Sequence, residues 1–187
     1  MKKFLNFLGE LVYLNFLFIF FSLPIITAGT GIAAAYQVLR MMDRDIEINM
    51  MSFYFENFKK LFKKTMVVNL IMVFLAGLFI LISSFLWNQD LIFAKMIFLM
   101  FISSSLIIVI TLIYYYYYVG LKYEISNIEL IKYSLFKGLI QIKKSLLLLV
   151  VPAILFLFFL IYNILAWEVI IVIGFSMNFY INYKVLK

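Results

Sequence analysis

Long apolar runs, separated by short basic segments, divide this sequence. Five of the runs approach or exceed the ~20 residues that an α-helix needs to cross about 30 Å of hydrocarbon. They cover residues 4–27, 65–87, 91–119, 146–167 and 169–183. The pattern predicts an all-α fold, with about five transmembrane helices in one membrane domain over residues 1–187.

Two further segments alternate apolar and charged positions with the period of a helix. They cover residues 46–64 and 126–144, and the second opens with Ser126 and Glu129, a capping box that marks a helix start. We expect two cytoplasmic amphipathic helices with lysines that contact lipid or a partner protein. These lysines are Lys59, Lys60, Lys63, Lys64, Lys143 and Lys144. The apolar face of the second helix is expected to comprise Ile128, Ile131, Leu135, Leu139 and Ile142.

A block rich in proline and glycine follows the first apolar run. Pro24 predicts a kink or a helix end, because proline lacks a backbone N–H, and the glycines after it are expected to turn the chain. The candidate structural joint comprises Pro24, Thr27, Gly29 and Gly31. A helix over Ile32 to Met42 would be too short to cross the bilayer.

The side of the N-terminus depends on this block. If residues 4–27 span, the N-terminus lies outside; if Phe4 to Met42 forms a bent or re-entrant hairpin, it lies inside. The run after Met1 is expected to be retained rather than cleaved as a signal peptide, because it is too long.

Glu10 and Asn15 form a candidate intramembrane polar site within the first run. A carboxylate inside a membrane is by default a functional hypothesis. Glu10 nevertheless lies near Lys2 and Lys3, which favours an interfacial position.

The composition agrees with a membrane protein. Of 187 residues, 67% are hydrophobic and 13% are charged, and the mean hydropathy is +1.11. Soluble domains contain about 45–50% apolar and about 25% charged residues.

The net charge of +7 is distributed asymmetrically. Residues 40–64, 120–145 and 184–187 hold 13 of the 16 basic residues. The positive-inside rule therefore places these segments in the cytoplasm, and lysines beside apolar runs argue against a nucleic-acid partner.

The chain contains no cysteine and no histidine, which excludes catalytic sites and zinc or haem sites that need them. Asp43, Asp45 and Glu47 have metal-like spacing, but ion pairs with Arg40 and Arg44 are the favoured interpretation. Tyr114 to Tyr118 point in all directions around a helix and are expected to form an interfacial aromatic belt. We expect no enzymatic activity and no cofactor.

An internal repeat is a further hypothesis. Lys63-Lys64-Thr65 and Lys143-Lys144-Ser145 each separate an amphipathic segment from an apolar run. Chance similarity between two lysine-flanked helical hairpins is the alternative.

Part of the sequence resembles the YesL-like integral membrane proteins, a family of unknown function. The resemblance rests on the block Ser22 to Gly29, continued through Ala33-Ala34-Ala35-Tyr36, and on Arg44-Asp45 before the helix over Phe53 to Phe62. Later apolar runs match only in layout, and Thr30 stands where the family often has proline. The resemblance implies a bacterial inner-membrane protein associated with carbohydrate uptake systems or sensor kinases.

Three classes of function follow. The preferred one is a non-enzymatic accessory or regulatory protein whose partners are membrane lipids and ABC-transporter permease subunits or a sensor kinase, with a homo-oligomer also considered. The second is a small transporter or channel, and the third is a membrane enzyme. The third lacks paired carboxylates and an activated nucleophile in the sequence.

Overall fold

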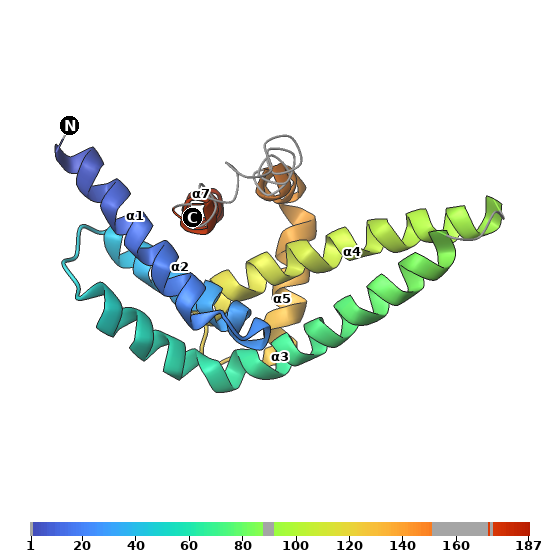
Figure 1. The fold of residues 1–187 in the computed structure, drawn as a ribbon, viewed down its shortest axis with the longest axis horizontal. Coiled ribbons are helices and arrows are strands. Elements are labelled where there is room, and N and C mark those ends of the chain that lie inside the picture. Colours follow the sequence, from blue (N-terminus) through green and yellow to red (C-terminus); the bar gives the residue numbers. More distant parts are fainter. Residues whose placement is uncertain (1, 88–91, 151–171, 173) are drawn as a thin grey trace.

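The computed structural model describes residues 2–87, 92–150, 172 and 174–187, and every regular element in these ranges is helical. Figure 1 shows a compact group of helices from which α3 (Met50–Trp87) and α4 (Ile92–Val119) extend as a long pair. The protein is all-α. Both of these helices are long and apolar enough to cross a membrane.

The first helices form a hairpin. Helix α1 (Lys2–Phe21) ends three residues before Pro24, and a 3-10 turn, η1 (Ile25–Thr27), leads into α2 (Ala28–Met42). Figure 1 shows α2 running back beside α1. The expected turn at Gly29 to Gly31 is therefore wrong: the chain reverses at residues 22–27, and both glycines lie in the first turn of α2.

Helix α2 is longer than expected because it begins at Ala28 rather than Ile32. Its 15 residues still span only about 22 Å at ~1.5 Å per residue, less than the hydrocarbon thickness of about 30 Å. The arrangement corresponds to the bent hairpin considered for residues 4–42, with both ends of the hairpin at the same side of the helix group (Figure 1).

The predicted amphipathic helix 46–64 and the predicted span 65–87 form one continuous helix, α3, which starts at Met50. Its 38 residues reach about 57 Å, roughly twice the thickness of the hydrocarbon core. The helix continues without a break through Lys64 and Thr65, where the basic segment gives way to the apolar run, so polarity changes along α3 without a change of secondary structure.

Helix α5 (Asn127–Ile140) begins where the capping box predicts: the Ser126 hydroxyl accepts a hydrogen bond from the Glu129 N–H at 3.3 Å. The helix ends before the expected residue 144, because the chain turns at Gln141, and residues 142–150 are helical again.

The buried face of α5 differs from the expected one. Leu130, Ser134 and Gly138 are buried, whereas Ile128 and Leu139 are 68% and 53% exposed. Small residues at four-residue spacing let α5 approach α4 closely. Of the other expected face residues, Leu135 and Ile142 are exposed and Ile131 is partly buried.

The tyrosine run is also buried rather than displayed on the surface. Tyr114 and Tyr115 are fully buried, and Tyr116 and Tyr117 are 7% and 6% exposed. They pack among several helices at the end of α4, so the expected aromatic belt is wrong for these four side chains.

Helix α7 (Phe175–Leu186) packs against α1 and α2, with Phe179 edge-on to Phe18 at 4.8 Å between ring centroids. The expected span 169–183 lies partly outside the described residues, and most of the expected span 146–167 lies outside them, as does the expected turn at residues 88–90.

Candidate functional site

The candidate site begins at the joint between α1 and α2. The Thr27 hydroxyl lies 2.7 Å from both the Phe21 and the Pro24 carbonyl oxygens, so it closes the turn by donating to one or the other. Pro24 precedes η1 with an extended backbone, at φ −74° and ψ 115°. These two residues of the predicted joint fix the start of α2.

The two glycines of the joint allow close helix packing. A Cβ added to Gly29 would lie 2.2 Å from Asn69 Oδ1 and 2.4 Å from the Tyr116 hydroxyl oxygen. A Cβ added to Gly31 would lie 2.5 Å from Ser22 Oγ. Neither glycine has a positive φ, so glycine is needed here for space rather than for backbone conformation.

A buried hydrogen-bond network occupies the space that Gly29 leaves. Tyr116 of α4 donates to Asn69 Oδ1 of α3 at 2.7 Å. Asn69 Nδ2 donates to the Ile26 carbonyl at 2.8 Å and to Thr30 Oγ1 at 3.4 Å. The Thr30 and Thr65 hydroxyl oxygens are 2.6 Å apart. The network joins the first turn of α2 to both long helices.

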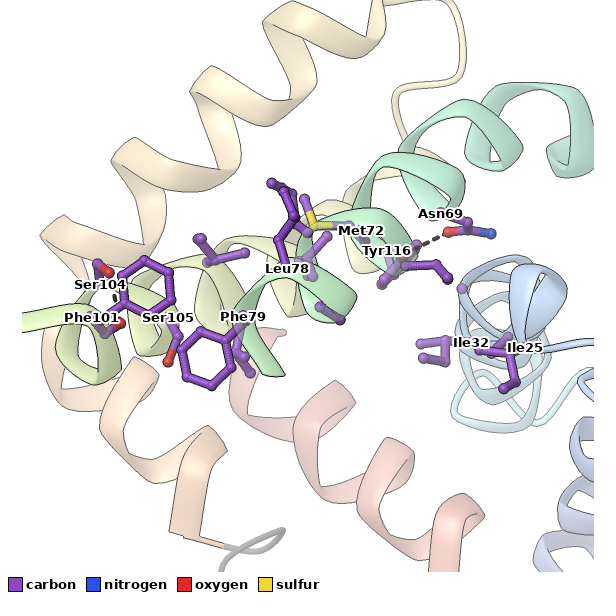
Figure 2. Close-up of a pocket in the computed structure, with 18 of the residues that line it drawn as sticks. Ile25, Ile32, Asn69, Met72, Leu78, Phe79, Phe101, Ser104, Ser105 and Tyr116 are labelled. Atoms are coloured by element: carbon purple, nitrogen blue, oxygen red, sulfur yellow. Dashed lines mark hydrogen bonds between the residues drawn. The ribbon is translucent and has the colours of Figure 1, made fainter. Parts of the chain in front are cut away.

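An apolar groove of about 670 Å³ extends from this network between α3 and α4. Figure 2 shows Asn69 and Tyr116 toward one end and Phe79 and Phe101 toward the other. The two phenylalanine rings stack at 5.1 Å between centroids, with an interplanar angle of 7°. We call the part of the groove at Asn69 and Tyr116 its polar end; Ser104 and Ser105 lie near the two phenylalanines, and the other walls are apolar (Figure 2).

None of the described side chains that line the groove is charged. Its polar side chains are Asn69, Ser104, Ser105 and Tyr116. Both serines donate to backbone carbonyls of their own helix, Ser104 to Phe101 at 2.8 Å and Ser105 to Ile102 at 2.6 Å. The groove is therefore suited to binding an apolar molecule.

The structure does not bring Glu10 and Asn15 together as one polar site. Glu10 is exposed on α1, whereas Asn15 is fully buried and its Oδ1 accepts a hydrogen bond from the Ser176 N–H at 2.9 Å. Asn15 therefore satisfies a backbone donor in the first turn of α7.

The six predicted contact lysines divide into two groups. Lys59, Lys60, Lys63, Lys143 and Lys144 are exposed. Lys64 is partly buried, and its ammonium group donates to the carbonyls of Tyr123 and Ile125, the latter at 2.7 Å. Lys64 therefore holds the α4–α5 connection instead of projecting outward.

The same connection is held from a second direction. Asn127 Nδ2 donates to the Lys64 carbonyl at 2.8 Å, and the Tyr115 hydroxyl donates to Asn127 Oδ1 at 3.1 Å. Two of the basic segments, 40–64 and 120–145, are thus joined in the structure.

Asp43 makes a different ion pair from the expected one. Instead of Arg40 or Arg44, it pairs with Lys184 and Lys187 near the C-terminus, and its own side chain is only 7% exposed. Hydrogen bonds from these two lysines lower the pKa of Asp43 to about 2. Asp45 and Glu47 are exposed, and no group of acidic residues that could hold a metal ion occurs in the described part of the chain.

The Lys63-Lys64-Thr65 and Lys143-Lys144-Ser145 segments differ locally. Thr65 lies inside the unbroken helix α3, whereas Ser145 follows the break at Gln141 and donates to the Gly138 carbonyl at 2.7 Å. The two segments therefore resemble each other in sequence but not in backbone structure, which does not support an internal repeat at these positions.

Sequence reasoning missed Asn69 and Tyr116 as members of one network. Asn69 is an isolated polar residue within an apolar run, and Tyr116 is one of five consecutive tyrosines, so neither indicates the other as a partner.

The packing of α5 on α4 was missed as well. The Ser134-x-x-x-Gly138 spacing is the signal in the sequence that indicates this close packing.

Comparison with known proteins finds one family model that is similar to part of the chain. Residues 11–84 match the family described as "Protein of unknown function, DUF624". This range covers most of α1, the joint, α2 and most of α3. No curated protein and no solved structure matches the chain. The YesL-like proteins are a DUF624 family, so this match confirms the resemblance over residues 11–84, the part of the chain that the family model covers.

Proposed function

We propose that the protein is a non-enzymatic accessory or regulatory protein of the bacterial cytoplasmic membrane that docks on another membrane complex. The exposed apolar surface of α3 and α4 carries this proposal. In the most apolar 18-residue windows of these helices, only 17% and 6% of the residues are buried. Surface of this kind requires a bilayer or another apolar partner.

The shape of the helix pair supports docking within the membrane. Figure 1 shows α3 and α4 extending beyond the other described helices. Large side chains on their outer faces, among them Phe74, Leu81 and Met100, are 65%, 68% and 73% exposed. Because lipid is as apolar as these side chains, association with a partner helix would depend on shape and packing.

The basic segments supply a second contact region. We place residues 40–64 and 120–145 in the cytoplasm, where their exposed lysines would contact anionic lipid headgroups or acidic residues of the partner. The family resemblance favours a permease subunit of a carbohydrate ABC transporter or a sensor kinase as that partner. The transporter alternative would require a polar route, and Glu10 and Asn15 lie apart rather than along one.

Site-specific photocrosslinking in native membranes tests the docking proposal. A photoreactive residue at Leu81 or Met100 should crosslink to one defined membrane protein, which should also co-purify stoichiometrically. The same residue at Glu56, which lies on the polar part of α3, is the control for labelling outside the apolar surface. Crosslinks to lipid alone from both apolar positions, with no stoichiometric partner, would overturn the proposal.

A further inference from the structure

The groove between α3 and α4 has an amide and a phenol near one end, and at the other end two serines whose hydroxyls donate to their own helix. Asn69, at its polar end, follows Lys64 by only about 7.5 Å along the helix, while Phe79 lies about 15 Å farther on. With the lysines at the headgroup level, the polar end lies near the interface and the apolar end lies toward the bilayer core.

Hydrogen-bond donors at the polar end are already used. Both hydrogens of Asn69 Nδ2 are directed at Ile26 O and Thr30 Oγ1, and the Tyr116 hydroxyl donates to Asn69 Oδ1. The two serines that line the groove donate to backbone carbonyls. What remains is acceptor capacity, since the Tyr116 oxygen and Asn69 Oδ1 each have a second lone pair.

Because acceptors remain free at the polar end and donors do not, a matching ligand must supply a hydrogen-bond donor there. A carboxylate or phosphate offers only acceptors and negative charge, and it would meet oxygen lone pairs with no cation among the described lining residues. A neutral hydroxyl group supplies the missing donor. Fully apolar chains would fill the remaining walls without leaving a polar group unpaired.

We propose that the groove binds a neutral lipid whose one polar group is a hydroxyl, a long-chain alcohol. The hydroxyl donates to Asn69 Oδ1 or to the Tyr116 oxygen, and the alkyl chain runs along the apolar walls toward Phe79 and Phe101. The volume of about 670 Å³ lies within the range of about 300–1,000 Å³ typical of small-molecule sites.

The selectivity resides in the hydroxyl group rather than in the chain. A ligand that comes from the bilayer exchanges lipid contacts for groove contacts, so burial of its chain contributes little hydrophobic free energy. Loss of the hydroxyl donor should therefore weaken binding about tenfold, the typical effect of one hydrogen bond. This inference holds for the purified protein and is independent of docking on another complex.

Photolabelling of the purified full-length protein in lipid nanodiscs tests the proposal. A photoactivatable long-chain alcohol should label peptides of α3 and α4 and be displaced by the unlabelled alcohol. The O-acetylated alcohol, the fatty acid of the same chain length and phosphatidylglycerol should compete about tenfold less well or worse. Equal competition by all four lipids would overturn the proposal.

Two variants locate the ligand. Ala76→Phe adds a large side chain within the groove, whereas Gly77→Phe adds the same side chain at the next position, where a new Cβ meets no atom within 4 Å and which does not line the groove. Labelling should fall about tenfold in Ala76→Phe and remain unchanged in Gly77→Phe, with both variants monitored for thermal stability. Unchanged labelling in a stable Ala76→Phe protein, or labelling mapped to another region, would refute the assignment.

Discussion

The Tyr116 hydroxyl donates to Asn69 Oδ1 at 2.7 Å directly beside Gly29, where a single added methyl group would overlap both partners. This relationship connects the joint that the sequence marks with proline and glycine to a tyrosine nearly 90 residues later. It also forms the polar end of the groove between α3 and α4. The joint therefore acts as a packing contact among three helices.

Replacement of Gly29 with alanine should destabilise the protein by about 1–3 kcal/mol, the usual cost of overpacking. The new Cβ would displace Asn69 or Tyr116 and break their hydrogen bond. Gly77→Ala is the matched control, because its Cβ would meet no atom within 4 Å and alanine favours a helix. The midpoint temperature of thermal unfolding in detergent should be lower than that of wild type for Gly29→Ala, and equal or higher for Gly77→Ala. Equal stability of Gly29→Ala and wild type would show that the close packing does not exist.

The Tyr116–Asn69 bond should be measurable as a coupling energy. Tyr116→Phe and Asn69→Leu each remove one partner, and each should cost about 1–3 kcal/mol because the other partner is left buried without its bond. The double variant should cost less than the sum, with a coupling of about 0.6–1.7 kcal/mol, as for hydrogen bonds inside membrane proteins. Additive losses in the double-mutant cycle would mean that the two side chains do not interact.

Asp43 should hold the C-terminal end of α7 in a pH-dependent way. The bonds from Lys184 and Lys187 lower the pKa of Asp43 from 3.8 to about 2, so the folded state favours the ionised carboxylate. The stabilisation is therefore complete above about pH 4 and is lost as the pH falls toward 2. The same contact raises the pKa of Lys184, which keeps the pair ionised at neutral and mildly alkaline pH.

Asp43→Asn should remove this dependence and release the C-terminal end at neutral pH. A cysteine introduced at Leu186, which is 6% exposed, would report the change, because the chain has no other cysteine. Its reaction with a maleimide at neutral pH should be faster in Asp43→Asn than in the Asp43 protein. Equal rates would indicate that Asp43 does not anchor this end.

Helix α5 offers a test of which face packs. Gly138→Leu should disrupt its contact with α4, because even a Cβ at this position would lie 2.9 Å from Ile110 Cγ2. Leu139→Ala, one residue later, should change stability by less than about 0.5 kcal/mol because Leu139 is 53% exposed. Thermal unfolding of both variants measures this difference. If the apolar face expected from the sequence were the buried one, Leu139→Ala would lose more stability than Gly138→Leu.

These elements also mark how far local sequence signals reach. The capping box at Ser126 and the helix end before Pro24 were predictable, since each depends on neighbouring residues. The burial of the tyrosines and the small-residue face of α5 were not, because a membrane protein can direct apolar side chains outward. Hydropathy then no longer distinguishes buried from exposed positions. The Asp43 contact with Lys184 joins residues 141 positions apart, and no local pattern indicates it.

Both the docking surface and the lipid groove require α3 and α4 to lie in the bilayer, and cysteine accessibility in membrane vesicles measures this position. Single cysteines at Phe74 and Leu81 should resist a membrane-impermeant maleimide in intact vesicles of either orientation. Cysteines at Lys59 and Lys143 should react, and only when the cytoplasmic side is accessible. If Leu81→Cys reacted as fast as Lys59→Cys, the helix pair would lie outside the bilayer, and both the docking surface and the lipid groove would be refuted.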